Sequence, residues 1–354
     1  MRFQFPCGRC KFFSILPQVK LSKLLFLLLC TAIASATDVV PYGLVRFNGV
    51  LSDDILNKNS ENLWHFDFGV QESVIGIKAS DTAFQNRLVL NGKLEVNFID
   101  DYNFKLNQVF ADFLFPNLGL NILFGKTQNL FSPFDPPATD YDKLAGSGNL
   151  TNESHQIRIT QKISTVEIAV AARKDKDYPA FESRISTAGS IKLGTSAFWA
   201  SEKTAIDADK NEDVPDSWGL SADLFAPVYF FNISGEFFMG QNLSSYGGIS
   251  ESYFKNIKFG VKSMGGWGAL GFALYDFSLN AGIGLEKITG LYWPDSLWLS
   301  TAKFANLNYN ITAKSKMSLE YCRLNMEYMA NSNGRVNKGK IGYNRIGALA
   351  TYEF

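Results

Sequence analysis

Side chains that could carry out nucleophilic or acid–base chemistry are few in this chain. It contains two histidines, His65 and His155, and His155 directly follows Ser154. Neighbouring residues of a regular strand point to opposite faces, so this pair cannot act as nucleophile and base within one strand. The motifs G-x-S-x-G and H-E-x-x-H and a phosphate-binding glycine loop do not occur. We therefore expect a protein that is not an enzyme, with a hydrolase that uses His155 as the alternative.

Metal and redox chemistry have equally little support. Residues 207–213 imitate the start of a calcium loop, but Glu212 stands where that loop needs glycine. Three of the four cysteines lie within residues 1–36, which we expect to be removed, and Cys322 is then alone. We expect no metal, no cofactor and no internal disulfide.

Residues 1–36 have the pattern of a cleaved export signal. Five basic residues and no acid accompany the apolar run 24–33, and the small residues 34–36 fit a cleavage site. The apolar run is too short for a helix that spans a membrane. Of 34 basic residues 29 remain after cleavage, against 34 acidic ones, so residues 37–354 carry a net charge of −5. No basic run indicates binding to nucleic acid.

The rest of the chain is a series of segments in which apolar and polar residues alternate. In residues 88–98, leucine, valine and phenylalanine share one face, and Asn91, Lys93, Glu95 and Asn97 share the other. This period of two is typical of strands. We count about sixteen strands, over residues 42–50, 63–78, 87–98, 103–115, 119–126, 155–163, 166–173, 181–187, 191–201, 217–225, 228–240, 257–273, 277–287, 297–310, 316–328 and 343–354.

The connections between these strands alternate between short and long. Residues 164–165 and 226–227 are short connections, whereas 202–216 and 242–256 are long ones. The periodicity alone would also fit a soluble sandwich, but a sandwich has no reason to sort its loops in this way. We therefore predict an all-β fold over 37–354: a single transmembrane antiparallel β-barrel with short periplasmic turns, longer extracellular loops and a wet lumen.

The polar faces of the predicted strands place both signs of charge in the lumen. The basic residues assigned to it are Arg46, Arg87, Lys93, Lys105, Arg158, Lys162, Arg173, Lys192, Lys258, Lys262 and Arg345. The acidic ones are Asp67, Glu95, Glu167, Asp223, Glu236, Glu286 and Glu320. Eleven against seven predicts a mild preference for anions, because rings of charge set the ion preference of a pore.

The longest connection, residues 127–154, is the best candidate for a functional loop. Connections of this length inside a compact fold are usually functional or disordered. Its three prolines favour a defined path, and Asp135, Asp140, Asp142 and Lys143 bring charge to it. We interpret it as a loop that folds inward and narrows the pore, with an ordinary surface loop as the alternative.

The last strand, residues 343–354, has apolar side chains at alternate positions and ends on Tyr352-Glu353-Phe354. This resembles the closing strand of bacterial outer-membrane barrels. The resemblance implies that Tyr352 and Phe354 form the membrane-insertion signal that the barrel-assembly machinery recognises.

Five stretches, together with Tyr352-x-Phe354, carry a resemblance to the DcaP-like family of outer-membrane porins. They are residues 66–78 (FDFGVQESVIGIK), 109–137 (ending GKTQNLFSPFDPP), 234–240 (SGEFFMG), 262–268 (KSMGGWG) and 278–284 (SLNAGIG). The resemblance implies a sixteen-stranded, homotrimeric porin in a Gram-negative outer membrane, in contact with its lipid and lipopolysaccharide. It also implies passage of small hydrophilic solutes, including anions such as dicarboxylates.

The sequence thus predicts a water-filled channel for passive diffusion. A second hypothesis is a structural or adhesin barrel whose lumen is plugged by side chains. Its support is a set of large apolar residues at positions assigned to the lumen: Phe198, Phe230, Phe238, Leu270 and Phe272.

Overall fold

The computed structural model describes most of the chain from Asp38 to Phe354. The described residues are 38–53, 64–70, 72–85, 87–98, 103–139, 143–150, 152–174, 179–201, 216–249, 260–289, 296–332 and 335–354. The predicted export signal, residues 1–36, lies outside them.

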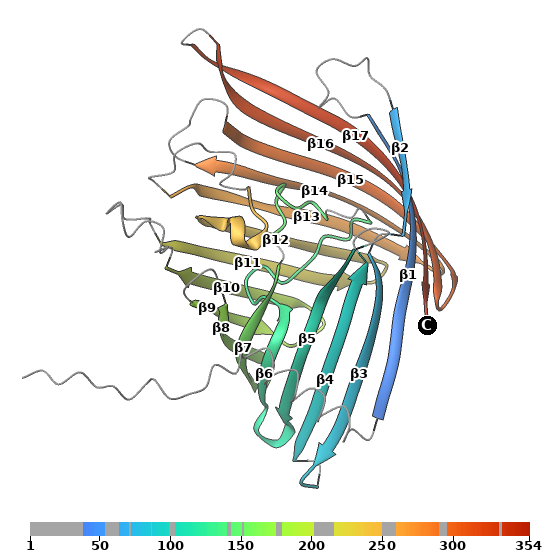
Figure 1. Ribbon diagram of the computed structural model, residues 1–354, viewed down its shortest axis with the longest axis vertical. Helices are drawn as coiled ribbons and strands as arrows, with labels where there is room; N and C mark the ends of the chain where they lie inside the picture. Colours follow the sequence, from blue (N-terminus) through green and yellow to red (C-terminus); the bar gives the residue numbers. More distant parts are fainter. Residues whose placement is uncertain are drawn as a thin grey trace, which may run out of the picture.

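Nearly all of the described chain is β-strand, and the strands follow one another around a single sheet (Figure 1). Their bounds are β1 (Asp38–Asp53), β2 (Trp64–Gly69), β3 (Ser73–Ala83), β4 (Leu88–Phe98), β5 (Phe104–Phe115), β6 (Leu120–Gln128), β7 (Glu153–Ile163), β8 (Val166–Lys174), β9 (Pro179–Thr187), β10 (Lys192–Ala200), β11 (Ser217–Val228), β12 (Phe231–Gln241), β13 (Lys262–Leu274), β14 (Phe277–Thr289), β15 (Ser296–Thr312), β16 (Ser315–Ser332) and β17 (Arg335–Glu353). Two short 3₁₀ helices, η1 (Pro116–Leu118) and η3 (Leu243–Tyr246), interrupt them.

The sheet is antiparallel throughout and closes on itself. β1 pairs with β17, from Leu44 opposite Glu353 to Ser52 opposite Arg345. The other edge of β1 pairs with β2 along one half and with β3 along the other, so β2 and β3 are successive parts of one strand. The seventeen segments therefore make a closed sixteen-stranded barrel. The predicted all-β barrel and its strand count are confirmed, and the predicted strand 63–78 corresponds to β2 with part of β3.

Short turns gather at one end of the barrel, and several of them use left-handed backbone at non-glycine residues. Ser164, Tyr229 and Tyr275 have φ values of 55°, 54° and 52°. Two-residue hairpin turns favour positive φ because that backbone matches the right-handed twist of the flanking strands. No described helix is long and apolar enough to cross a membrane.

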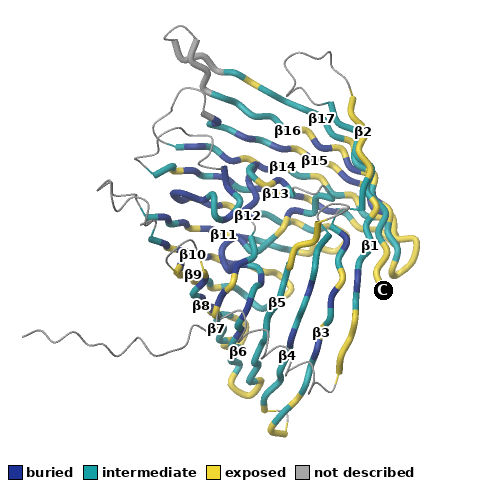
Figure 2. Tube along the Cα trace, in the orientation of Figure 1, coloured by how far each residue is buried: buried dark blue, intermediate teal, exposed yellow. Residues whose placement is uncertain are grey.

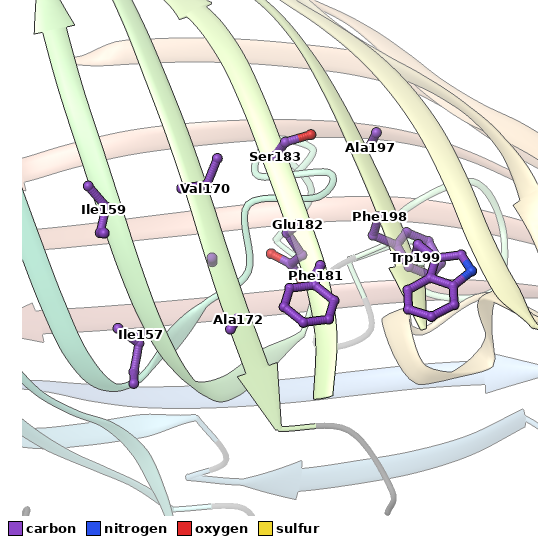
Figure 3. Close-up of a pocket in the computed structure, with 11 residues that line it drawn as sticks. Ile157, Ile159, Val170, Ala172, Phe181, Glu182, Ser183, Ala197, Phe198 and Trp199 are labelled. Atoms are coloured by element: carbon purple, nitrogen blue, oxygen red, sulfur yellow. The ribbon is translucent and has the colours of Figure 1, made fainter. Parts of the chain in front are cut away.

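The outer face of the barrel is mainly apolar, and the inner face holds the buried polar residues. Buried residues alternate with more exposed ones along the strands (Figure 2). On β7, for example, Ile157 and Ile159 are about half exposed, whereas Gln156 on the other face of the same strand is buried. An apolar hollow of about 630 Å³ lies among outward side chains of β7 to β10, where Phe181 stacks on Trp199 (Figure 3). This distribution is the reverse of a soluble protein, in which exposed apolar patches of this size are rare.

Candidate functional site: the lumen and its inward-folded loop

The connection between β6 and β7 enters the barrel instead of leaving it (Figure 1). Its first anchor is Leu130 on the wall formed by β8 to β10. The Leu130 amide donates to Glu182 Oε2 at 2.7 Å, and its carbonyl accepts from Ser196 Oγ at 3.1 Å. The next residue, Phe131, packs edge-on against Phe198 of β10, with ring centroids 4.7 Å apart. The start of the loop is thus fixed by both polar and aromatic contacts.

The loop then crosses the lumen to the opposite wall. Glu236 of β12 accepts hydrogen bonds from the Ser132 hydroxyl and from the Phe134 amide, the latter at 2.7 Å. Farther along, the Thr139 amide donates to Glu320 Oε2 of β16 at 2.6 Å. The Thr139 carbonyl accepts from the Arg46 guanidinium of β1. Wall residues that are widely separated in sequence therefore hold one extended segment across the interior.

The returning half of the loop lies against β13 to β15. Leu144 packs with Trp267 and Phe304, and Ser147 Oγ lies 2.7 Å from Ser300 Oγ. Gly148 has φ +109°, and a Cβ there would lie 2.2 Å from the Gly266 carbonyl oxygen. Only glycine allows this close approach of the loop backbone to the wall.

A second inward segment, η3, covers the loop from the side. Tyr246 is fully buried, and its hydroxyl donates to Glu182 Oε1 at 2.7 Å and accepts from Arg173 Nε at 2.9 Å. Burial and the Glu182 carboxylate raise the pKa of Tyr246, so the phenol stays neutral and keeps its proton for this hydrogen bond. Arg173 Nε also lies 3.1 Å from Glu182 Oε1. Arg173 faces the lumen, but η3 separates it from the open space.

On the wall formed by β1 and β3 to β5, Lys93 remains partly exposed, and its carboxylate partner Glu95 is buried. Lys93 Nζ lies 2.8 Å from Glu95 Oε2, and the Tyr42 hydroxyl donates to the same oxygen at 2.5 Å. Lys78 lies over the Tyr42 ring, with Nζ 4.5 Å from the centroid. Because the described parts of the loop and η3 fill the opposite side, this wall borders the solvated part of the lumen.

Most of the residues that sequence reasoning assigned to the lumen lie on inward-facing positions of their strands. The basic ones are Arg46, Lys93, Lys105, Arg158, Lys162, Arg173, Lys192 and Arg345, and the acidic ones are Asp67, Glu95, Glu167, Asp223, Glu236, Glu286 and Glu320. Lys258, Asp140 and Asp142 lie outside the described residues. Asp135 and Lys143 form an ion pair on the loop, with Nζ 2.8 Å from Oδ2. Burial lowers the pKa of Lys143, but the Asp135 carboxylate outweighs this effect and the pKa is raised.

Two of the lumen assignments are wrong. Arg87 lies exposed in the turn between β3 and β4, outside the strands. Lys262 shares the outer face of β13 with Leu270, which is 52% exposed, while Ser263 and Trp267 point inward. The same shift of one position places Phe272 outside, and Phe230 lies exposed in a turn. The rule that polar residues face inward fails on β13, because this strand places the apolar Trp267 on its inner face, against the loop, and the charged Lys262 on its outer face.

Sequence reasoning missed two lumen residues on β9, Glu182 and Arg184. Both alternate with the outward Phe181 and Ile185, so their inward position could have been read from the period of two. Arg184 makes a bidentate contact with Asp223 of β11, at 2.5 and 2.8 Å, and its guanidinium lies 5.9 Å from the Phe134 ring. The Arg184–Asp223 ion pair therefore lies beside Phe134 of the loop.

The residues considered for catalysis, Ser154 and His155, lie on opposite faces of β7, and the calcium-loop imitation at residues 207–213 lies outside the described residues. Ser154 faces inward and donates to Asn129 Oδ1, whereas His155 is exposed on the other face of β7. Among the described residues, no group of three or more His, Cys, Asp or Glu side chains could hold a metal ion.

A closed sixteen-stranded barrel with an apolar outside, a polar inside and a long loop across the lumen has the architecture of an outer-membrane porin. Comparison with solved structures supports this class. The outer membrane channel DcaP of Acinetobacter baumannii aligns with a TM-score of 0.71 and 16% identity, over 90% of this chain and 97% of that chain. An anion-selective porin from Comamonas acidovorans aligns with a TM-score of 0.65 and 10% identity, over 90% and 99%.

OmpF of Salmonella typhi, in complex with daunomycin, aligns with a TM-score of 0.66 and 10% identity, over 89% of this chain and 97% of that chain. No family model matches the chain, and a search of curated proteins found no match. The DcaP-like resemblance inferred from the sequence is confirmed at the level of the fold: the chain has the fold of the outer-membrane porins.

Proposed function

We propose that this protein is a porin-type channel of a Gram-negative outer membrane, through which small hydrophilic solutes diffuse passively. The observation that carries the proposal is the loop between β6 and β7, which is fixed across a polar lumen by Glu182, Glu236 and Glu320. A loop in this position sets the size of the passage. The apolar outer face supports a location in lipid, and the pairing of β1 with β17 closes the sheet, so the described barrel has no free first or last edge strand whose backbone would meet hydrocarbon.

A mild preference for anions follows from which lumen charges are covered. Glu182, Glu236, Glu286 and Glu320 are each buried beneath the loop or η3 segments and are used in hydrogen bonds to them. Inward cations such as Lys162 are exposed. The uncovered charge of the lumen is therefore more positive than a count of all inward residues suggests, and charge that lines a pore sets ion preference.

We propose that the barrel assembles as a homotrimer. One of the similar structures is a trimer form of OmpT of Vibrio cholerae, which supports a homotrimer here. We also propose an exported precursor with a cleaved signal at residues 1–36, contact with outer-membrane lipid and lipopolysaccharide, and recognition of Tyr352 and Phe354 by the barrel-assembly machinery. Phe354 pairs with Gly43 through two backbone hydrogen bonds, so it belongs to the seam that closes the barrel.

Single-channel recording in planar bilayers tests the function. The refolded barrel is expected to conduct, with a reversal potential in a potassium chloride gradient on the anion side. A folded barrel that never conducts would favour the plugged structural barrel, because Phe198 and Phe238 do fill part of the lumen beneath the loop. A cation-side reversal potential would remove the proposed anion preference but keep the channel.

A further inference from the structure

Five neighbouring strands each place a described cation on the outer face of the barrel. They are Lys262 on β13, Lys287 on β14, Lys303 on β15, Arg323 on β16 and Lys340 on β17. The strands run side by side toward the long-loop end of the barrel (Figure 1). Among them, Lys340 has an acidic partner in Glu327 at 3.8 Å, and Lys287 lies over the Trp298 ring. We call these five residues the outer basic belt.

At the centre of the belt, two like charges face each other directly. Lys303 and Arg323 are paired across β15 and β16, and both are exposed. Side chains in such pairs have Cβ atoms about 5 Å apart, and like charges in this position are destabilising. The outward positions flanking the pair hold Ile283 and Asn344. No described carboxylate occupies the next outward positions along the two strands, which are Thr301, Ala305, Tyr321 and Asn325.

The outward carboxylate on the nearby strand β1 is already engaged. Asp53 accepts from the Asn344 side chain at 2.7 Å and from the Asn344 backbone amide. Asn344 in turn accepts from the Tyr321 hydroxyl at 2.7 Å. The network leaves the Lys303–Arg323 pair, among the described residues, with a surplus of positive charge and adjacent polar groups.

The position of the pair along the barrel adds to its cost. On β15, exposed apolar residues run from Tyr309 through Leu307 and are followed by Lys303. At about 3.3 Å per residue and a tilt near 40°, Lys303 lies roughly 15 Å above Tyr309 along the membrane normal, within an apolar band about 25 Å tall. Cations at this depth direct their charged ends toward the headgroups. An anion held there would offset both desolvation and mutual repulsion.

We infer that Lys303 and Arg323 form a binding site for the phosphate group of a membrane lipid in the leaflet on the long-loop side. Arginine binds phosphate through two parallel N–H donors, and lysine adds a point charge. Lys287, one strand away, extends the positive field toward the loops. The inference rests on the proposed membrane location and is independent of conduction.

A lipid phosphate fits the pair better than a second copy of the chain does. The outward acids on the described strands are Asp53, Asp81, Glu153 and Glu327, each on a different strand. The described strands of a neighbouring copy therefore offer no two outward carboxylates on one strand to meet two cations. A phosphate monoester carries up to two negative charges in one group.

The test uses the full barrel in a neutral maltoside detergent, titrated with dioleoyl phosphatidic acid and followed by native mass spectrometry. Dioleoyl glycerol, with the same acyl chains and no phosphate, is the lipid control. The wild type is expected to prefer phosphatidic acid. The double variant Lys303→Gln/Arg323→Gln is expected to lose about thirtyfold of that affinity, since each cation near an anionic lipid contributes about a factor of five.

The matched protein control is Lys126→Gln/Lys174→Gln, which removes two outward cations from β6 and β8 on the other side of the barrel. Less than a twofold change is expected there. Equal affinity in the wild type and in Lys303→Gln/Arg323→Gln would overturn the inference, as would an equal loss in the control. Displacement of the lipid by millimolar inorganic phosphate would show a site for free anions, which also overturns it.

The same spectra report assembly. If the double variant changes the oligomeric mass while it keeps phosphatidic acid affinity, the pair faces a second copy and the lipid inference is wrong. Conductance of the double variant is expected to equal that of the wild type. A wild type that binds lipid but never conducts would contradict the proposed function and leave the lipid site standing.

Discussion

Glu236 and Glu320 fix the two ends of the segment that crosses the lumen, so their removal should release it. Glu236 accepts from Ser132 and Phe134, and Glu320 accepts from Thr139. We choose the double variant Glu236→Gln/Glu320→Gln because glutamine keeps the volume of the side chain and removes only the negative charge and part of the acceptor capacity.

The expected size of the effect follows from the number and kind of contacts. A hydrogen bond to a charged group contributes about 1.5–3 kcal/mol to stability. Losing the charge at both sites therefore weakens the loop by about 3–6 kcal/mol, less what the glutamine oxygens recover. A factor of ten in an equilibrium corresponds to about 1.4 kcal/mol, so a net loss of about 3 kcal/mol would raise the population of the detached loop by about a hundredfold.

Single-channel conductance and liposome swelling with sugars of graded size measure the result. The double variant should conduct more, with larger fluctuations, and admit larger sugars than the wild type. Glu167→Gln is the matched control, because it removes the same charge from an inward position of β8. Glu167 lies opposite Lys162 of β7 and Ser186 of β9 and not against the loop. If the double variant and Glu167→Gln give the same conductance and size limit, the loop does not control the passage and the reasoning fails.

Three further outcomes are expected from the loop and the lumen. Gly148→Ala should lower the melting temperature by an amount equivalent to about 1–3 kcal/mol, because its Cβ would meet wall backbone at a φ of +109°. Gly146→Ala, with open space around it, should lower the melting temperature less. Equal losses of the two variants in thermal melts would argue against the close approach. The pKa of Lys143 is raised by its carboxylate partner, so the stabilisation is fully present below the usual lysine pKa and is lost as the pH rises through the higher value. Lys143→Met should therefore melt lower than the wild type near neutral pH and converge with it only in strong alkali; a constant difference would refute the ion pair. Lys162→Glu should shift the anion-to-cation permeability ratio by about twofold or more toward cations, and Lys262→Glu, on the outer face, should leave the reversal potential unchanged.

The barrel itself could be predicted from the sequence because a strand has a period of two. Ile157 and Ile159 alternate with Arg158, and the same pattern recurs at regular spacing along the chain. When one face of each strand meets lipid and the other meets water, register and strand number are strongly constrained by side-chain type alone. The long connection between β6 and β7 was identifiable for the same reason, as a break in that pattern.

Inner positions beneath the loop could not be predicted in this way. Trp267 and Phe238 point into the lumen and are buried there by loop and η3 residues, so the rule that polar residues face inward fails where the interior is packed rather than wet. The assignment of Lys262 to the lumen failed for that reason. The period of two fixes which residues share a face but not which face is inside.

The path of the loop was decided only by the tertiary structure. Ser132 and Phe134 donate hydrogen bonds to Glu236, which lies more than a hundred residues later, and Thr139 donates to Glu320, which is still farther along the chain. These partners become neighbours only because the closed barrel brings its opposite walls together around one lumen. The sequence determined that the chain forms strands with one apolar face, since that depends on local alternation, whereas the position of the charges relative to the passage depends on closure.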